Sequence, residues 1–285
     1  MYRFLIVGST GIVGHQVLRQ LSATGAKIRA LTRNPNEAHF PPPVEVVHGD
    51  LAVPETLDAC LDGIDTVFLV WGAPSAAVAP ALERIARHAR RIVFLSSPHK
   101  TPHPFFQGAQ PNPSAALHVQ IEQLIEGSGL QWTFLRPGIF AANALRWWSS
   151  RIRARDVVRW RYLAVPTAPI DERDIAAVAV RVLIEEGHAG AEYVLTGPHP
   201  LSQIEQLSMI GRVLGRSLRI EEISPEEARR ELPGIMPASV VNMLLDAWAA
   251  AVDQPAFVTS TVTEITGAPA RTFLDWVTYH AADFL

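Results

Sequence analysis

The stretch YRFLIVGSTGIVG, residues 2–14, decides the fold of this chain. Its apolar run at residues 4–7 is rich in β-forming side chains and predicts a strand buried on both faces. The run ends at glycines, and apolar residues at helical spacing follow from Val13 to Leu21, with Gly25 after them. The glycines therefore lie where a strand passes into a helix, beside free N–H groups and the positive end of the helix dipole. This junction predicts a site for a diphosphate.

The glycines of this stretch, Gly8, Gly11 and Gly14, form a GxxGxxG pattern. Dinucleotide-binding folds use one glycine for the tight turn, one for close approach to the diphosphate and one for packing the helix on the strand. The position between a strand and a helix favours a bound dinucleotide over a glycine turn without a ligand. Thr10 and Ile12, which stand between the glycines, are expected to contact the same cofactor.

Predicted strands and helices alternate through the first half of the chain. Strands are expected at residues 27–31, 44–47, 66–70, 92–95 and 131–135, and helices at 54–61, 79–90 and 114–126. This alternation predicts an α/β fold, a doubly wound parallel sheet of the Rossmann type with its ligands at the carboxyl ends of the strands. The dinucleotide-binding domain is assigned to residues 1–143, completed by 166–197. A smaller α/β substrate-binding portion is assigned to residues 144–165 and 198–285.

Composition narrows the class of protein. The 285 residues are 48% apolar, which allows one large α/β domain with a smaller annex, and the net charge of −3 offers no field for nucleic acid or an anionic membrane. The single cysteine, Cys60, excludes an intrachain disulfide and suits a reducing compartment. No apolar run reaches the roughly 20 residues that cross a bilayer, and no charged leader precedes the first strand. We therefore expect a soluble, cytoplasmic protein.

The end of the second predicted strand bears on the choice of cofactor. Residues 31–34 contain no Asp or Glu, the side chain that accepts the ribose 2′-hydroxyl of NAD. Arg33 instead offers a planar donor group that matches the 2′-phosphate of NADP. NADP(H) is therefore favoured, and NAD(H) is the alternative if Arg33 is only an exposed loop residue. Asp50, which precedes Leu51 just past the third strand, either meets the adenine amino group or caps a turn.

Further candidate ligands follow the later strands. Trp71, Gly72, Ser96 and Pro137 are expected along the cofactor, since each stands at or beyond the carboxyl end of a predicted strand. Ser96 or Ser97 is expected to hydrogen-bond the oxygen of an acceptor. Residues 98–113 contain five prolines and predict a mobile loop or lid beside the pocket, and residues 39–43 form a shorter proline-punctuated loop.

From residue 143 onward arginines alternate with Trp147, Trp148, Trp160 and Tyr162. Basic residues interleaved with aromatics can bind nucleic acid, but the segment is short and the rest of the chain is acidic. A flap facing the substrate, or a contact between the subunits of a homodimer, is the preferred interpretation. No metal site is predicted.

Five segments together resemble one family: GSTGIVG at 8–14, RNP at 33–35, GDL at 49–51, HVQIEQLIEGSGLQWTFLRPGIFAAN at 118–143 and GAPARTFLDW at 267–276. Over essentially its whole length the chain is similar to the NmrA-like branch of the atypical short-chain dehydrogenases/reductases. The resemblance implies a Rossmann domain with a small carboxyl-side substrate domain. Members of this branch include NAD(P)H-dependent quinone reductases, natural-product reductases and redox sensors that bind the dinucleotide without turnover.

The chain departs from the parent superfamily at the catalytic pair. Ordinary short-chain dehydrogenases use a Tyr and a Lys four residues later, whereas the corresponding helix here has His118 and Glu122. Their spacing puts both side chains on one helix face, and a carboxylate beside an imidazole favours its charged, proton-donating form. We therefore expect His118 to act as an acid with Glu122, while Ser97 helps to polarise the substrate carbonyl. The alternative is that both are remnants in a site that needs no acid.

Loss of the Tyr/Lys pair discriminates among substrates. Reduction of an isolated ketone leaves a basic alkoxide, for which a positioned acid is worth about 10²–10⁴ in rate. Reduction of a quinone leaves a weakly basic phenolate that water can protonate. We therefore expect an NAD(P)H-dependent oxidoreductase that transfers a hydride to a quinone-like or polycyclic aromatic natural product, with Phe140, Asn143 and Trp147 at the substrate.

Two other outcomes are compatible with the same residues. Reaction of the hydroquinone with O₂ would make the net result the hydroxylation of an aromatic polyketide. A non-catalytic NADP(H) sensor that acts through a protein partner is the alternative, because the missing Tyr/Lys pair suits binding without turnover. A nucleotide-sugar epimerase is disfavoured, because that chemistry depends on the missing tyrosine.

Overall fold

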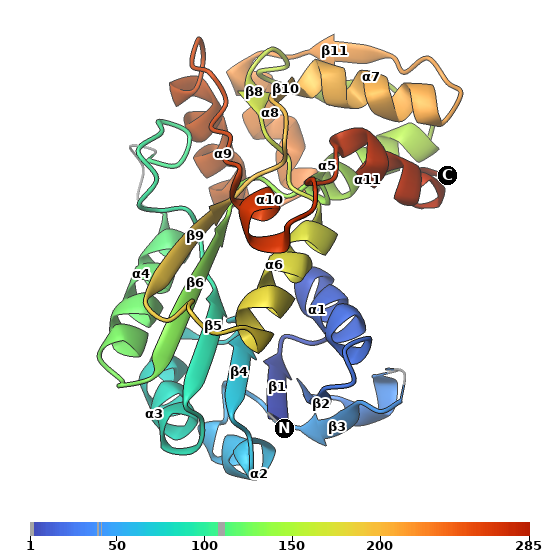
Figure 1. Ribbon diagram of the computed structural model, residues 1–285. Helices are drawn as coiled ribbons and strands as arrows, with labels where there is room; N and C mark the ends of the chain where they lie inside the picture. Colours follow the sequence, from blue (N-terminus) through green and yellow to red (C-terminus); the bar gives the residue numbers. More distant parts are fainter. Residues whose placement is uncertain (1–2, 39, 41, 108–111) are drawn as a thin grey trace.

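A parallel sheet forms the centre of the molecule in the computed structural model, which describes residues 3–38, 40, 42–107 and 112–285 (Figure 1). Its seven strands have the order β3-β2-β1-β4-β5-β6-β9. They are β1 (Arg3–Val7), β2 (Lys27–Thr32), β3 (Glu45–His48), β4 (Thr66–Leu69), β5 (Arg91–Leu95), β6 (Gln131–Pro137) and β9 (Ala191–Leu195). The strand order reverses between β1 and β4, and ligands of open α/β sheets bind at such a switch point. The predicted doubly wound fold is confirmed.

Helices cover both faces of this sheet. One face packs on α1 (Ile12–Ser22) and α6 (Glu172–Ile184), and the other on α2 (Leu57–Leu61), α3 (Val78–His88) and α4 (Pro113–Glu126). Neighbouring side chains of β1 enter opposite clusters, Ile6 on the α1 side and Leu5 on the α3 side. Short 3₁₀ turns are η1 (Pro35–Glu37), η2 (Pro54–Thr56), η3 (Ser75–Ala77), η4 (Leu232–Gly234) and η5 (Ala281–Phe284). The helix expected at 54–61 is thus a 3₁₀ turn followed by α2.

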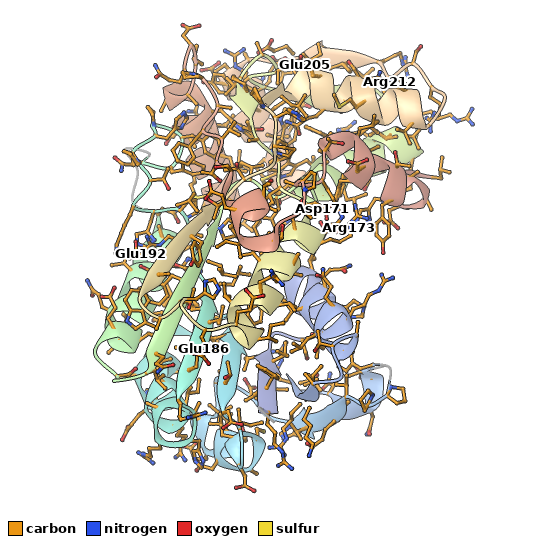
Figure 2. All side chains as sticks on the ribbon, in the orientation of Figure 1. Asp171, Arg173, Glu186, Glu192, Glu205 and Arg212 are labelled. Carbon is orange, nitrogen blue, oxygen red and sulfur yellow. The ribbon has the colours of Figure 1, made fainter. Side chains whose placement is uncertain are left out.

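The carboxyl-side part lies beyond the end of β6 and has its own core (Figure 1). Its elements are α5 (Asn143–Arg153), β7 (Val158–Trp160), β8 (Pro166–Thr167), β10 (Leu201–Ser202), α7 (Gln203–Val213), β11 (Ile220–Glu222), α8 (Pro225–Glu231), α9 (Ala238–Ala250) and α11 (Phe273–Tyr279). Ser202 and Glu205 form a capping box at the start of α7, on the upper edge in Figure 2. In contrast to this core, Val262 of α10 (Thr261–Thr266) packs in the α1–α6 cluster, so part of 198–285 returns to the dinucleotide-binding domain.

The tryptophan-rich segment forms the centre of that carboxyl-side core. The indole rings of Trp147, Trp148 and Trp160 are buried and pack on one another, and those of Trp147 and Trp160 also pack on Trp248 of α9, with ring centroids 5.6–5.9 Å apart. The predicted flap or subunit contact is therefore wrong for these rings, as is a place for Trp147 at the substrate. The physical reason is their large apolar area, which a small domain needs for its own core.

Among the described residues, no helix is both long and apolar enough to span a membrane.

Candidate active site

The turn between β1 and α1 fits a diphosphate. Gly8 has φ of +81°, and a Cβ added there would lie 2.7 Å from Cβ of Val70. A Cβ on Gly14 would lie 2.1 Å from the carbonyl oxygen of Gly8, so only glycine allows the helix to start this close to the strand. Gly11 precedes α1, and within the described ranges no side chain caps that helix. Its first N–H groups are therefore available to an anion.

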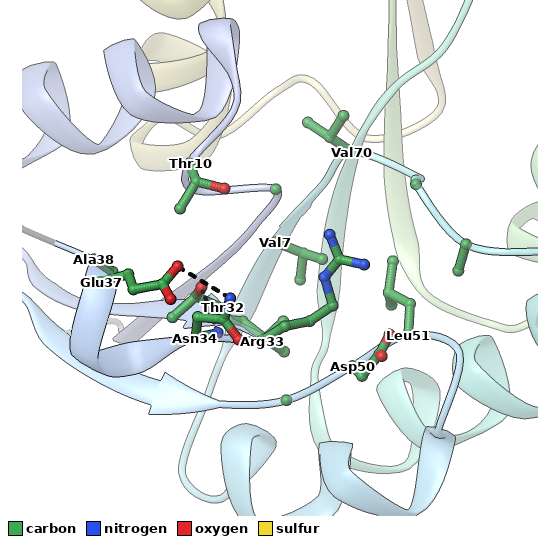
Figure 3. A pocket seen from close by; sticks show the side chains of 15 residues that line it. Val7, Thr10, Thr32, Arg33, Asn34, Glu37, Ala38, Asp50, Leu51 and Val70 are labelled. Carbon is green, nitrogen blue, oxygen red and sulfur yellow. Dashed lines mark hydrogen bonds between the residues drawn. The ribbon is translucent and has the colours of Figure 1, made fainter.

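A groove of about 360 Å³ continues from this turn over the ends of β1 and β2 (Figure 3). Six of the residues predicted to bind the cofactor line it, namely Gly8, Thr10, Arg33, Asp50, Leu51 and Gly72. In Figure 3 the guanidinium of Arg33 extends from the end of β2 into the groove. Ile12, the first residue of α1, is 57% exposed beside the same turn. An exposed isoleucine next to backbone donors suits a cofactor that covers it.

Asp50 and Trp71 have local partners in the same region. Oδ1 of Asp50 accepts the N–H of Ala52 at 2.8 Å, so Asp50 closes a turn and also lines the groove. The turn cap predicted for Asp50 is therefore present, and the predicted contact with the adenine remains compatible with its position. The indole N–H of Trp71 donates to the carbonyl oxygen of Ala73 at 2.6 Å, which fixes the ring over its own turn.

A second cavity, of about 180 Å³, lies past the ends of β5 and β6, on the other side of the switch point from the groove. We call it the acceptor cavity. Its apolar wall consists of Phe105, Phe106, Ile139, Met243, Leu244 and Ala247, and its polar lining includes Ser97, His99 and Asn112. Dinucleotides in this fold lie across the switch point, so one half occupies the groove and the other points toward this cavity.

The loop predicted as a lid forms one side of the acceptor cavity. The rings of Phe105 and Phe106 meet edge to face with centroids 5.2 Å apart. Nε2 of His103 lies 2.9 Å from the carbonyl oxygen of Pro255, which attaches the loop to the carboxyl-side part. Residues 108–111 of the expected lid, like residues 39 and 41 of the shorter proline loop, lie outside the described residues.

Glu122 belongs to a buried ionic cluster beside the acceptor cavity. The side chains of Glu122 and Arg136 are each 2% exposed. Arg136 donates from Nε to Oε1 of Glu122 at 2.9 Å and from Nη2 to Oε2 at 2.6 Å, and Ser96 Oγ donates to Oε1 at 2.6 Å. Burial alone lowers the pKa of Arg136, but its hydrogen bonds to Glu122 and Glu192 outweigh burial and raise it. The guanidinium therefore stays charged and keeps the Glu122 carboxylate in place.

The expected pairing of His118 with Glu122 is not formed. Over the described part of the chain, no hydrogen bond or ion pair joins the two; Glu122 is held by Arg136 and instead faces Nε2 of His99 at 3.3 Å. Burial is the largest influence on His118 and lowers its pKa, the nearby His99 acts in the same direction, and the opposing effect of Glu122 is too weak to reverse it. The i, i+4 spacing places the two residues near each other, but Arg136 on β6 donates two hydrogen bonds to the Glu122 carboxylate and so determines where it points.

Other predicted site residues also have partners elsewhere. Ser96 is buried and its hydroxyl is used by Glu122, so it is not available to a ligand as predicted. Pro137 is buried within β6. Phe140 packs against the α1–α6 cluster, and Asn143 begins α5. Among the described residues that line the acceptor cavity, neither Phe140, Asn143 nor Trp147 is found.

Several residues of the acceptor cavity were missed from the sequence. His99 stands two residues after Ser97, at a strand end where ligands were expected, and this position was the available indication. Phe105 and Phe106 lie in the loop that was predicted as a lid, so their aromatic rings could have been named. Met243, Leu244 and Ala247 lie on α9, far along the chain from this loop, and nothing local to their helix indicates which site it faces.

Comparisons with known proteins agree with this geometry. The family described as NAD(P)H-binding matches residues 8–186. The chain is 37% identical over 290 residues to a (4-alkanoyl-5-oxo-2,5-dihydrofuran-3-yl)methyl phosphate reductase of Streptomyces griseus subsp. griseus, covering 98% of both chains. It is 33% identical over 291 residues to an NAD(P)H azoreductase of Xenophilus azovorans, again covering 98% of both.

A solved structure shares the fold. The structure of an NADPH-dependent quinone oxidoreductase from Escherichia coli in complex with NADPH superposes with a TM-score of 0.80 at 23% identity, covering 97% of this chain and 99% of that one. The glycine turn, the groove and the family match over most of the sheet agree with one another. The chain therefore belongs to the NAD(P)H-binding, NmrA-like branch of the atypical short-chain dehydrogenases/reductases and is an NAD(P)H-dependent oxidoreductase.

Proposed function

We propose that this oxidoreductase reduces a flat, conjugated acceptor of the quinone or azo type by direct hydride transfer, with NADPH preferred over NADH. The observation that supports the proposal most is the acceptor cavity, which has two phenylalanine rings and an aliphatic wall at the carboxyl ends of β5 and β6. Such a wall binds an aromatic ring through apolar burial and ring contacts. Its place opposite the dinucleotide groove suits transfer between two bound molecules.

The groove offers a matching partner for each part of the cofactor. Gly8, Gly11 and Gly14 would hold the diphosphate, Arg33 the 2′-phosphate and Asp50 the adenine. Thr10, Ile12, Leu51, Trp71 and Gly72 would surround these contacts. The nicotinamide supplies a hydride when the cofactor is bound. The protein then has to hold the acceptor flat, exclude water and provide a proton.

The cavity lining favours a neutral acceptor. Among the described residues that line it, none is Lys or Arg, and His99 is the side chain that can become cationic. A phosphate ester such as the one in the name of the Streptomyces griseus reductase would need a permanent cation such as Lys or Arg there. An uncharged quinone or azo compound, including an aromatic natural product, needs only the apolar wall and a donor for its oxygen or nitrogen. Ser97 is the hydroxyl at that position.

A steady-state assay of cofactor oxidation tests this function. NADPH and NADH would each be mixed with a naphthoquinone, an azo dye and a dihydrofuranone phosphate, under air and under nitrogen. We expect acceptor-dependent oxidation with the first two, faster with NADPH and independent of oxygen. Oxygen uptake in proportion to acceptor consumed would extend the outcome to hydroxylation of the aromatic ring. Tight NADPH binding with no oxidation by any acceptor would refute the proposal and favour the sensor.

A further inference from the structure

We propose that Ser97, His99 and Glu122 form a proton relay that protonates the reduced acceptor in place of the missing Tyr/Lys pair. The proposal rests on the proposed function, because it concerns the acceptor cavity of that reductase. Ser97 and His99 both line the cavity, and Glu122 lies behind the imidazole. The side chain of His99 is only 9% exposed, so the cavity is its main opening.

The surroundings of the two ring nitrogens decide which proton can leave. Nδ1 of His99 lies 3.0 Å from the carbonyl oxygen of Ser97 and 3.4 Å from Ser97 Oγ. Nε2 lies 3.3 Å from Oε2 of Glu122, is buried, and has no hydrogen-bond partner among the described residues. The carbonyl and the carboxylate are both acceptors. A neutral imidazole therefore leaves one lone pair facing an acceptor, whereas the doubly protonated ring donates on both sides.

Glu122 keeps this position because its surroundings are fixed. Arg136 donates to both carboxylate oxygens, and Ser96 donates to Oε1. Arg136 also pairs with Glu192, which lies on the edge strand β9 and is labelled in Figure 2. Glu192 in turn accepts a hydrogen bond from Nζ of Lys100 at 3.0 Å. The four charges of this ionic cluster balance one another. A second proton on the His99 ring therefore adds a positive charge to this cluster. The Glu122 carboxylate faces that charge, and the lowered pKa of His99 lets the proton leave readily.

The relay moves one proton and no electrons. Arrival of the hydride leaves the acceptor with one negative charge on an oxygen or nitrogen. Ser97 Oγ gives its proton to that atom and takes the Nδ1 proton of His99. The ring becomes neutral and keeps its Nε2 proton, which faces Oε2 of Glu122, until solvent returns a proton to Nδ1. The 3.4 Å separation of Oγ and Nδ1 is loose, as catalytic contacts often are before the substrate binds.

Charged groups on three elements set the titration of His99. Burial is the largest influence and lowers its pKa, and Arg136 of β6 and Lys100 of its own loop act in the same direction. Glu122 of α4 opposes them and acts to raise the pKa of His99. The charge of His99 in turn lowers the pKa of His118 on the same helix. The charged ring is therefore a stronger acid than a free histidine. Since its population falls as pH rises, the rate of the relay should fall as well.

The relay selects a class of acceptor. A phenolate is weakly basic, so a benzoquinone gains little from an acid. The anion left by reduction of an azo bond or of an unsaturated carbonyl is more basic, and for such an acceptor a positioned acid is worth about 10²–10⁴ in rate. The site is therefore built for azo and unsaturated carbonyl acceptors rather than for simple quinones.

Rates of H99Q and S97A at saturating NADPH test the relay, with H88Q as the control. His88 ends α3 just before β5 begins, at the opposite edge of the sheet from the cavity. With an azo dye we expect H99Q to lower kcat about 10²–10⁴-fold, to leave KM nearly unchanged and to remove the fall of rate with rising pH. With a benzoquinone the loss should be below about tenfold. S97A should lower kcat with the azo dye by a similar factor. The double variant S97A/H99Q should be little slower than either single variant.

A ligand-free measurement complements the rates. The imidazole proton signal of His99, assigned by its loss in H99Q, should titrate below the ordinary histidine pKa of 6.5, and still lower in E122Q. An active wild type whose H99Q variant keeps both the azo rate and the pH dependence overturns the relay alone. A pKa of His99 at or above the ordinary histidine value of 6.5 also overturns it. A wild type that binds NADPH but reduces no acceptor refutes the proposed function and the relay together.

Discussion

Removal of Arg136 should expose how much the fold depends on the ionic cluster around Glu122. In R136M, Glu122 of α4 loses both guanidinium contacts at a place where its side chain is only 2% exposed. Breaking a buried pair by removing one partner costs about 3–5 kcal/mol, and Lys100, whose Nζ lies 3.9 Å from Oε2 on a 53% exposed side chain, compensates only weakly. For a chain of this size that corresponds to a fall in Tm of roughly 5–8 °C. The apolar stem of methionine fills most of the vacated volume, so packing changes little.

A double variant separates charge from packing. In E122M/R136M no charge is left unpaired, and the main loss is the hydrogen bond of Ser96 Oγ, worth about 1 kcal/mol. We therefore expect the double variant to recover most of the stability that R136M loses. R151M serves as the control, because Arg151 and Asp156 form an exposed pair whose loss should cost less than about 1 kcal/mol.

Urea unfolding followed by far-ultraviolet circular dichroism and by tryptophan fluorescence measures these effects. Five of the seven tryptophans, Trp147, Trp148, Trp160, Trp248 and Trp276, lie in the carboxyl-side core, so fluorescence reports chiefly on that part, whereas dichroism reports on the whole chain. Coincident transitions would justify a single free energy of unfolding. A loss below about 1 kcal/mol in R136M, or a double variant as unstable as R136M, would refute the reasoning.

Three further changes have defined outcomes. G14A places a Cβ 2.1 Å from a backbone oxygen, so NADPH binding and Tm should both fall, while G234A, with nothing within 4 Å of its added Cβ, should change neither. R33M removes a charged donor from the groove, and the Kd for NADPH measured by fluorescence titration should rise about 10–100-fold with that for NADH unchanged; an equal rise for both would contradict a 2′-phosphate contact. Burial lowers the pKa of His280, but its hydrogen bonds to Glu172 and Asp283 outweigh burial and raise it. Its contribution to stability is therefore complete below its unfolded value of 6.5 and is lost as pH rises through the raised pKa, so the urea midpoint of H280N should decline less than that of the wild type above pH 6.5.

The cofactor half of the site could be predicted because it is local. The glycine turn, the strand before it and the helix after it lie within residues 3–22, and their pattern specifies both the backbone and its ligand. Arg33 and Asp50 follow the next two strands of the sheet, where parallel packing brings their ends together. Each inference used only spacing along the chain and the general rule for strand ends.

The acceptor half could not be predicted in the same way, because its contacts join distant segments. Spacing placed His118 and Glu122 on one helix face but gave no information on Arg136, whose position on β6 decides where the carboxylate points. The apolar rings of Trp147 and Trp148 fit both a substrate wall and a core, and only the arrival of Trp248 from α9 settles the choice. Side-chain competition between elements is not encoded in any short window of sequence.

Cofactor binding and the choice of acceptor depend on different parts of the chain. The groove depends on backbone geometry at Gly8 and Gly14, where an added side chain would collide with neighbouring atoms. Substitution of these two residues should therefore disturb cofactor binding. The wall of the acceptor cavity comes from the loop after β5, the turn after β6 and α9, and these segments contribute side chains rather than backbone. Most of these wall positions can change without disturbing the sheet, because they lie beyond its strands. The same hydride-delivering half can therefore serve different acceptors, while Ser97 and His99 after β5, with Glu122 held by Arg136 of β6, supply the proton to those acceptors whose reduced form is basic.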